Sequence, residues 1–260
     1  MNSPKIVGVV ALKGGVGKTT VVANLGAALA DHYNKKVLIV DANFSTPHLG
    51  LHVGLVNPKQ NLHPVLSDDY SIYEAIYQHE LGFHIIPGKL APTEVNALAL
   101  KEKLEPLREI YDIIIVDSSP SLNNEMAATM DASDELIVVS SPDYPTLSST
   151  LHAVNLAKKQ NTVIRGIVLN KVRRKKFELG SKDIAEASEV KVLASLPDSL
   201  KVLSATAKMV PVVIHFPKEE ISHIYKKLAG SIIGEKYKKI SAKKSKKKAT
   251  LLKKNTKRKD

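Results

Sequence analysis

Short runs of apolar, mostly β-branched residues alternate with helical patterns along most of this chain. Residues 113–116, with the sequence Ile-Ile-Ile-Val, are apolar without a break, which is typical of a strand buried on both faces of a parallel sheet. Strands that alternate with helices predict an α/β fold, namely a doubly wound, mostly parallel sheet with helices on both faces. At 260 residues the chain is long enough for one such domain with a sizeable core.

The pattern places each element by its residue range. Strands are predicted at 6–11, 37–41, 83–87, 113–117, 135–139, 163–170 and 190–196. Helices are predicted at 20–30, 71–78, 94–110, 123–130, 146–159, 182–187 and 200–207, and a last amphipathic helix after Pro217. Ser71 and Glu74 have the spacing of a capping box at the start of the second helix.

A glycine-rich segment follows the first strand and opens the first helix. It consists of Gly14, Gly15, Val16, Gly17, Lys18, Thr19 and Thr20. Glycines let the backbone approach a polyphosphate, and their N–H groups can donate to its oxygens. In this context Lys18 is predicted to contact the β- and γ-phosphates, and the Thr19 hydroxyl to bind Mg²⁺. The segment therefore predicts a nucleotide site rather than a turn without a ligand.

Two positions depart from the plain phosphate-loop pattern. Leu12 stands where that pattern has its first glycine, and Lys13 adds a second lysine before the loop. One loop can use only a limited positive charge on one phosphate chain. Lys13 is therefore expected to point somewhere other than its own pocket.

Polar residues end three of the predicted strands, at Asp41, Asp117 and Asn170. Ligands of open α/β sheets bind outside the carboxyl ends of the strands, so these side chains are expected near the glycine loop. An aspartate there can bind Mg²⁺ through water or orient an attacking water, although a single one could equally cap a helix or form a turn. Asn170 could read the edge of a base through its amide.

The positive charge is confined to one end of the chain. The net charge is +12, and residues 236–260 hold 13 Lys and Arg against one acid. We therefore expect a neutral domain over 1–235 and a Lys-rich, disordered tail over 236–260. Such a tail is expected to contact nucleic acid non-specifically or an anionic membrane surface, and the alternative is a solubilising tail without a dedicated partner. A second basic cluster, residues 171–176, follows Asn170.

The cysteine count and the hydropathy exclude several classes of protein. The chain has no cysteine, so disulfides, thiolate metal ligands and iron–sulfur clusters held by this chain alone are excluded. No stretch is apolar enough to span a bilayer, and a cytoplasmic protein is expected, peripheral on the membrane or the nucleoid if its tail is engaged.

These motifs together resemble the ParA/MinD family of P-loop ATPases over residues 4–235, in a form similar to archaeal MinD-like proteins. The early lysine, Lys13, is the defining feature of the family's deviant Walker A motif. Residues 117–122 resemble its Walker B motif and second switch, and residues 41–51 its first switch. The resemblance also covers residues 134–139, 168–171 and 196–198, the last of which resembles the segment that borders adenine.

The resemblance implies ATP or ADP with Mg²⁺ as cofactors, and a homodimer when ATP is bound. Lys13 would then reach the phosphates held by the other subunit. Lys13, Lys18, Asp41, Asn43 and Asp117 would form the catalytic set, with Thr19, Asp41 and Asp117 as metal ligands and Asn170, Pro197 and Asp198 beside the adenine. The function implied is a molecular switch in division-site positioning or in partition of DNA or another cargo, driven by hydrolysis of ATP to ADP and phosphate.

Asn43 departs from the family pattern, which commonly has an acid at this position. An amide can orient water, but it cannot accept a proton as a carboxylate does. Hydrolysis is therefore expected to be slow or to depend on an activating protein partner. The alternatives are a nucleotide-dependent scaffold with little hydrolysis and a polyanion-binding adaptor that acts through its tail.

Overall fold

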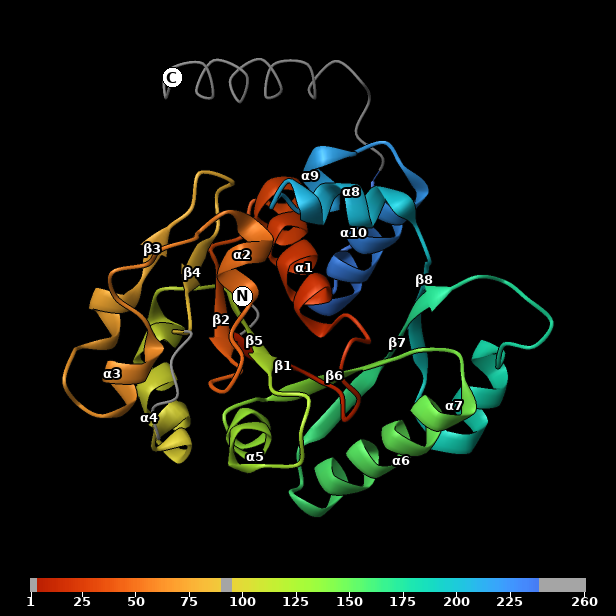
Figure 1. The fold of residues 1–260 in the computed structure, drawn as a ribbon, viewed down its shortest axis with the longest axis horizontal. Helices are drawn as coiled ribbons and strands as arrows, with labels where there is room; N and C mark the ends of the chain where they lie inside the picture. The colour runs from red at the N-terminus through yellow and green to blue at the C-terminus, as the bar shows by residue number, and fades with distance from the viewer. Residues whose placement is uncertain (1–3, 90–94, 239–260) are drawn as a thin grey trace.

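The computed structural model describes residues 4–89 and 95–238, and its centre is one eight-stranded sheet (Figure 1). The strand order is β3-β4-β2-β5-β1-β6-β7-β8. The strands are β1 (Lys5–Val10), β2 (Val37–Ala42), β3 (Tyr77–Gln78), β4 (His84–Ile86), β5 (Ile113–Ser118), β6 (Glu135–Ser140), β7 (Val163–Val172) and β8 (Val192–Pro197). All neighbours pair in parallel except β3, which is antiparallel to β4. The predicted doubly wound sheet is therefore confirmed, with one antiparallel edge strand.

Helices cover both faces of this sheet (Figure 1). They are α1 (Lys18–Tyr33), α2 (Leu49–Val53), α3 (Leu62–Leu66), α4 (Leu100–Leu104), α5 (Asn124–Asp131), α6 (Tyr144–Lys159), α7 (Ser181–Ser188), α8 (Leu200–Ala207), α9 (Val212–His215) and α10 (Glu220–Ile233). Successive residues of a strand point to opposite faces. Ile113 and Ile115 accordingly pack in the core with α1 and α10, whereas Ile114 and Val116 pack in the core with α4 and α5.

Two predicted helices are wrong as continuous helices. Over 71–78 the structure has a 3₁₀ turn, Ile72–Ala75, followed by strand β3. The capping box is present, with the Ser71 N–H donating to Glu74, but pairing of Tyr77 with β4 overrides further helix. Over 94–110, residue 94 lies outside the described residues, and the rest is divided into the 3₁₀ helix Ala97–Ala99, α4 and the 3₁₀ helix Glu105–Glu109. Pro106 has no N–H to donate to the preceding turn, which prevents a continuous α-helix there.

The other predicted elements are present with small shifts at their ends. The sequence patterns missed the two-residue strand β3 and the short helices α2, α3 and α9. Elements of five or fewer residues are too short to show a measurable strand or helix period. The predicted tail, 236–260, lies outside the described residues apart from 236–238. None of the helices within residues 4–89 and 95–238 is both long and apolar enough to cross a lipid bilayer.

Candidate functional site

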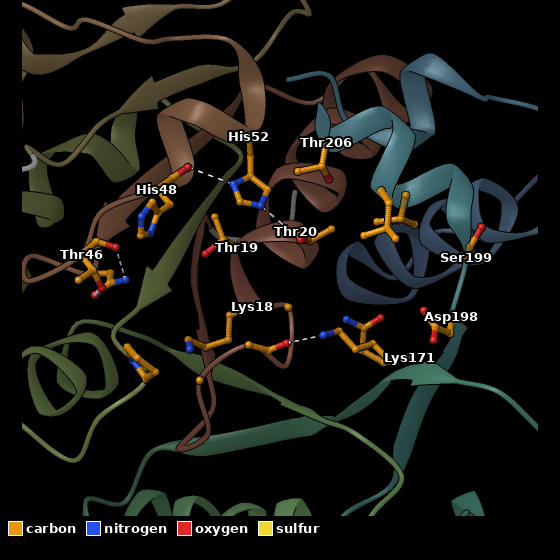
Figure 2. Close-up of a pocket in the computed structure, with 18 of the residues that line it drawn as sticks. Lys18, Thr19, Thr20, Thr46, His48, His52, Lys171, Asp198, Ser199 and Thr206 are labelled. Atoms are coloured by element: carbon orange, nitrogen blue, oxygen red, sulfur yellow. Dashed lines mark hydrogen bonds between the residues drawn. The ribbon is translucent and has the colours of Figure 1, made fainter. Parts of the chain in front are cut away.

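A cavity of about 420 Å³ opens at the carboxyl edge of the sheet. Ten of the predicted site residues line it: Gly14, Gly15, Gly17, Lys18, Thr19, Thr20, Asn43, Asn170, Pro197 and Asp198. Figure 2 shows Lys18 and Thr19 between two ends of the cavity, with Thr46 and His48 at one end and Asp198 and Ser199 at the other. The strand order explains this convergence. In the sheet, β2 and β5 lie on one side of β1, and β6, β7 and β8 lie on the other, so the carboxyl ends of strands from both sides meet beside the loop that follows β1.

The glycine loop has the backbone that its sequence requires. Gly17 is left-handed, with φ 98° and ψ 28°, and a Cβ at this position would lie 2.3 Å from the Nδ2 atom of Asn170. That nitrogen donates to the Val16 carbonyl at 2.7 Å. Val16 itself is buried in the core and does not line the cavity. Helix α1 begins at Lys18 without a side-chain cap, so its first N–H groups face the loop and can donate to an anion.

Lys18 and Asp117 are two buried charged residues of the site. Their side chains belong to residues that are 7% and 0% exposed. Burial lowers the pKa of Lys18, and the charge of Asp117 acts in the opposite direction. Burial also raises the pKa of Asp117 to about 6, although Thr19 and Lys18 act to lower it. Both carboxylate oxygens of Asp117 are buried without a hydrogen-bond partner among the described residues.

Asp41 lies next to Asp117, because β2 and β5 pair with these two residues in register. Burial, and then the charge of Asp117, raises the pKa of Asp41. Its Oδ2 atom accepts the Leu49 N–H at 2.8 Å and its Oδ1 atom the Asn43 N–H at 3.3 Å. Neither Asp41 nor Asp117 lines the cavity; the Asp41 carboxylate braces the segment that follows β2, whereas that of Asp117 has no hydrogen-bond partner among the described residues. The structure therefore brings the two predicted aspartates together but gives them different surroundings.

Both polar atoms of the Asn43 amide form hydrogen bonds within its own segment. Its Nδ2 atom donates to the Thr46 carbonyl at 2.7 Å, and its Oδ1 atom accepts from the Thr46 hydroxyl at 3.3 Å. Both residues line the cavity. In this arrangement the Asn43 side chain shapes the cavity wall, and its hydrogen-bonding capacity is directed at Thr46.

Lys13 lies outside the cavity that the loop glycines, Lys18, Thr19 and Thr20 line. Its Nζ atom donates to the Thr146 hydroxyl at 2.8 Å and to Asp143 at 3.3 Å, at the start of α6. Partial burial would raise the pKa of Asp143, but hydrogen bonds from Ser141, Thr146 and Lys13 lower it to about 2. The extra lysine therefore points away from its own pocket, and a carboxylate that is ionised at neutral pH holds it there.

The opposite end of the cavity is built from exposed groups. Asp198 accepts from the Nε atom of Arg173 at 2.7 Å, with side-chain exposures of 36% and 62%. Helix α8 contributes Val202, Leu203 and Thr206 to this wall. Pro197 ends β8 and places Asp198 at the rim. An apolar wall with a carboxylate and the Asn170 amide at its edge suits a nucleotide base.

Several lining residues were not predicted from the sequence. They are Thr46, His48, His52, Pro120, Lys171, Ser199, Val202, Leu203 and Thr206. Lys171 donates from Nζ to the Gly15 carbonyl at 2.7 Å, so it braces the loop from β7 (Figure 2). His52 connects α2 to the loop, with Nε2 3.4 Å from the Thr20 hydroxyl and Nδ1 3.0 Å from the His48 carbonyl. The sequence offered a signal for some of them, since Lys171 directly follows Asn170, Thr46 and His48 lie within residues 41–51, and Pro120 lies within residues 117–122.

The phosphate end of the cavity fits magnesium and a polyphosphate. Within residues 4–89 and 95–238 the Asp117 carboxylate has no hydrogen-bond partner, and oxygen ligands of this kind are those that Mg²⁺ prefers. Thr19 lowers the pKa of Asp117 and lines the cavity, whereas the buried Asp117 is not among the lining residues. Thr19 and Asp117 would hold the ion, and Lys18 with the N–H groups of the loop would hold the phosphates.

Comparison with known proteins agrees with this geometry. A family model described as an AAA domain matches residues 4–166, more than half of the chain. An uncharacterized ATP-binding protein of Methanocaldococcus jannaschii is 33% identical over 227 residues, which covers 85% of each chain. The crystal structure of the cell division ATPase MinD of Pyrococcus furiosus has a TM-score of 0.85 and 29% identity, covering 88% of this chain and 98% of that one.

This chain belongs to the ParA/MinD family of P-loop ATPases. MinD of Pyrococcus horikoshii, solved in complex with Mg-ADP, is similar at a TM-score of 0.84 and 29% identity, covering 88% of this chain and 96% of that one. The family therefore includes a member with magnesium and a nucleotide bound. The resemblance that the sequence motifs indicated is confirmed.

Proposed function

We propose that this protein is an ATP-dependent dimerising switch that hydrolyses ATP to ADP and phosphate. The observation that carries the proposal is the Asp117 carboxylate, which is buried near Lys18 and Thr19 and has no hydrogen-bond partner in the described part of the chain. An unpartnered buried carboxylate is costly, and a divalent cation bound with a nucleotide would offset that cost. The Mg-ADP complex of a MinD relative supports the same assignment.

Each residue at the phosphate end has a distinct part in the proposed reaction. Mg²⁺ would neutralise charge on the phosphates when it is bound with ATP. Lys18 would contact the β- and γ-phosphates, and Thr19 with Asp117 would hold the ion. Asp41 would keep the Asn43 segment in place through its hydrogen bonds to Leu49 and Asn43. Water adds to the γ-phosphorus, and the bond to the ADP oxygen breaks.

Lys13 is proposed to complete the site of a second subunit. Its contacts with Asp143 and Thr146 leave its charge outside its own cavity. A cation supplied by the partner would neutralise charge across an interface that phosphates would otherwise make repulsive. ATP would then favour the dimer, and hydrolysis would release it.

Sedimentation velocity of the full chain tests this role. We expect dimers with ATP and Mg²⁺ and monomers with ADP. Lys13→Ala should remain monomeric in ATP while it still binds the nucleotide. Lys101→Ala is a matched control, because Lys101 also forms an exposed ion pair, with Asp131. Dimers of Lys13→Ala as abundant as those of the wild type would contradict the proposal.

The process served is proposed to be division-site positioning or partition of DNA or another cargo, with an activating protein partner and a polyanionic surface that the tail contacts. Membership of the family supports the first part, and the charge of residues 236–260 supports the second. The test is co-sedimentation with DNA and with anionic liposomes, in ATP or ADP, at low and high salt. Equal binding to DNA and to liposomes with and without ATP would overturn the proposal of a switch. If a chain without residues 241–260 loses this binding and keeps ATP binding, a tail-based adaptor is favoured.

A second candidate is a nucleotide-dependent scaffold with little hydrolysis. The engagement of both Asn43 amide atoms by Thr46 favours it, because these bonds hold the side chain against its own segment and leave only one N–H and one oxygen lone pair for a water molecule. Both candidates predict ATP-dependent dimers. Phosphate release above background from the wild-type dimer supports the switch, and its absence supports the scaffold.

A further inference from the structure

The segment that follows β2 is attached to helix α5 by a single carboxylate, that of Glu125. The Ser45 hydroxyl donates to Oε1 of Glu125, and the Ser45 N–H donates to Oε2 at 3.4 Å. Both donors of one residue therefore bind both oxygens of one side chain. The two residues are 80 positions apart in the sequence. Both bonds are exposed to solvent and the N–H bond is long, so the attachment depends mainly on the hydroxyl bond to the carboxylate, a kind of bond stronger than one between neutral groups.

Each end of this contact leads to the cavity. Ser45 lies between Asn43 and Thr46, which both line it. Glu125 is in the first turn of α5, and only residues 119–123 separate that helix from β5, which ends one residue after Asp117. The Asn123 side chain caps α5 by accepting the Met126 N–H, so the turn that carries Glu125 is well defined. The contact thus connects the chain after Asp117 to the cavity wall.

The neighbouring residue Phe44 is fixed to a different part of the molecule. Its carbonyl lies 3.2 Å from the Nε2 atom of His63, which is 4% exposed. The Nδ1 atom of His63 accepts the Lys89 N–H at 3.3 Å, so the hydrogen is on Nε2 and is donated to Phe44. This anchor joins the segment to His63 of α3 and to Lys89, which follows β4. Neither His63 nor Lys89 lines the cavity. The Ser45 contact, in contrast, joins it to α5.

We propose that Glu125 is a positioning residue that couples the segment 43–48 to α5. A change at the phosphate end that moves the chain after Asp117 would move α5, and Glu125 would carry that movement through Ser45 to Asn43 and Thr46. The two walls of the phosphate end then respond to the γ-phosphate as one unit. This inference rests on the proposed function, because it takes the ligand to be ATP or ADP.

A local role for Glu125 makes a different prediction. An acid in the first turn of a helix interacts favourably with the helix dipole, and this alone could account for Glu125. Its removal would then loosen α5 and leave the segment 43–48 unchanged. The two roles are therefore distinguished by where in the chain the effect of a substitution is found.

Hydrogen exchange of the full chain without nucleotide measures the contact directly. In Glu125→Ala we expect the amides of 43–48 to exchange about tenfold faster, since a bond to a charged acceptor is lost. Ser45→Ala should give a smaller increase, because its N–H still donates to Glu125. Glu109→Ala is the matched control, because Glu109 is an exposed acid at the end of the 3₁₀ helix Glu105–Glu109 and no change is expected there. If Glu125→Ala cannot be purified as a folded protein, Glu125→Gln, which keeps the size and one acceptor, replaces it.

The ratio of affinities for fluorescent ATP and ADP analogues measures the coupling. We expect Glu125→Ala to reduce the preference between them about fivefold, the scale of a modest coupling between sites. Ser45→Ala combined with Glu125→Gln should change the ratio by less than the product of the two single effects. The proposal would be overturned if hydrogen exchange in Glu125→Ala changed only in α5, or if this variant kept the wild-type ratio of ATP to ADP affinity. A wild-type chain that bound neither analogue would overturn the proposed function instead, while the exchange data would still decide whether Glu125 holds the segment.

Discussion

The two ends of the cavity are built on opposite principles. The phosphate end contains three buried ionisable residues, Lys18, Asp41 and Asp117. Burial lowers the pKa of the lysine and raises the pKa of both aspartates, so it favours the neutral form of each. At the base end, Asp198 and Arg173 form an exposed ion pair, and Leu203 is 63% exposed. Exposed ion pairs contribute little to stability, whereas buried charges without partners cost a great deal. The phosphate end is therefore poised for an ionic ligand, and the base end tolerates change.

Lys18→Ala has the largest expected effect and tests directly whether the two ends of the cavity differ. It removes the buried cation from the phosphate end, and we expect ATP affinity to fall about 100-fold, because charge-assisted bonds to phosphate are lost. Titration with a fluorescent ATP analogue measures this. Lys171→Ala is the control, since Lys171 binds the Gly15 carbonyl and should affect affinity far less. A loss of less than threefold for Lys18→Ala would remove the distinction between the two ends.

Asp117→Asn compares the two ends of the cavity through the stability of the folded protein. Because the folded-state pKa of Asp117 is raised to about 6, the folded chain binds a proton more tightly than the unfolded chain does. Stability of the wild type should therefore fall as pH rises from about 4 to 6, where the unfolded chain has already lost that proton. The amide cannot ionise, so we expect the variant to be more stable by about 2 kcal/mol at pH 7.5 without nucleotide.

Urea unfolding at pH 5 and at pH 7.5 measures this difference. The matched comparison is Asp198→Asn at the base end, whose stability should match that of the wild type at both pH values. An Asp117→Asn variant less stable than the wild type at pH 7.5 would mean that the buried carboxylate is stabilised after all.

Asn43→Asp tests the wall of the phosphate end. The carboxylate can accept a proton and cannot donate to the Thr46 carbonyl as the Asn43 amide does, so the side chain is released toward the cavity. We expect phosphate release about tenfold faster at saturating ATP, which is at the low end for general acid–base catalysis. Single-turnover phosphate release measures it, and an unchanged rate would show that Asn43 does not limit hydrolysis.

The smallest effect is expected at the base end. Asp198→Ala removes an exposed acceptor from the rim, and we expect the preference for ATP over GTP to change about threefold, with stability within about 0.5 kcal/mol of the wild type. Competition between the two nucleotides for the fluorescent analogue measures the preference. A loss of ATP binding comparable with that of Lys18→Ala would show that both ends are equally demanding.

Much of the site could be predicted because its parts are local. The glycine loop, its position between β1 and α1, and the strand-end aspartates are each encoded within a few residues of sequence. The parallel sheet predicted Asp41 and Asp117 near the glycine loop, and the pairing of β2 with β5 in the structure places them directly beside each other. The helix over 71–78 failed for the opposite reason, since pairing of β3 with β4 depends on residues that come later in the chain.

The sequence by itself determined the family, the parallel sheet and the phosphate loop, because periodicity, glycine positions and strand-end residues act over short distances. The tertiary structure decided where the charged and amide side chains point. Lys13 contacts Asp143 across 130 residues, Ser45 contacts Glu125 across 80, and Asn170 contacts the loop across 154. Each of these contacts depends on how distant strand ends come together and on which side chains are removed from water there, and no local pattern carries that information.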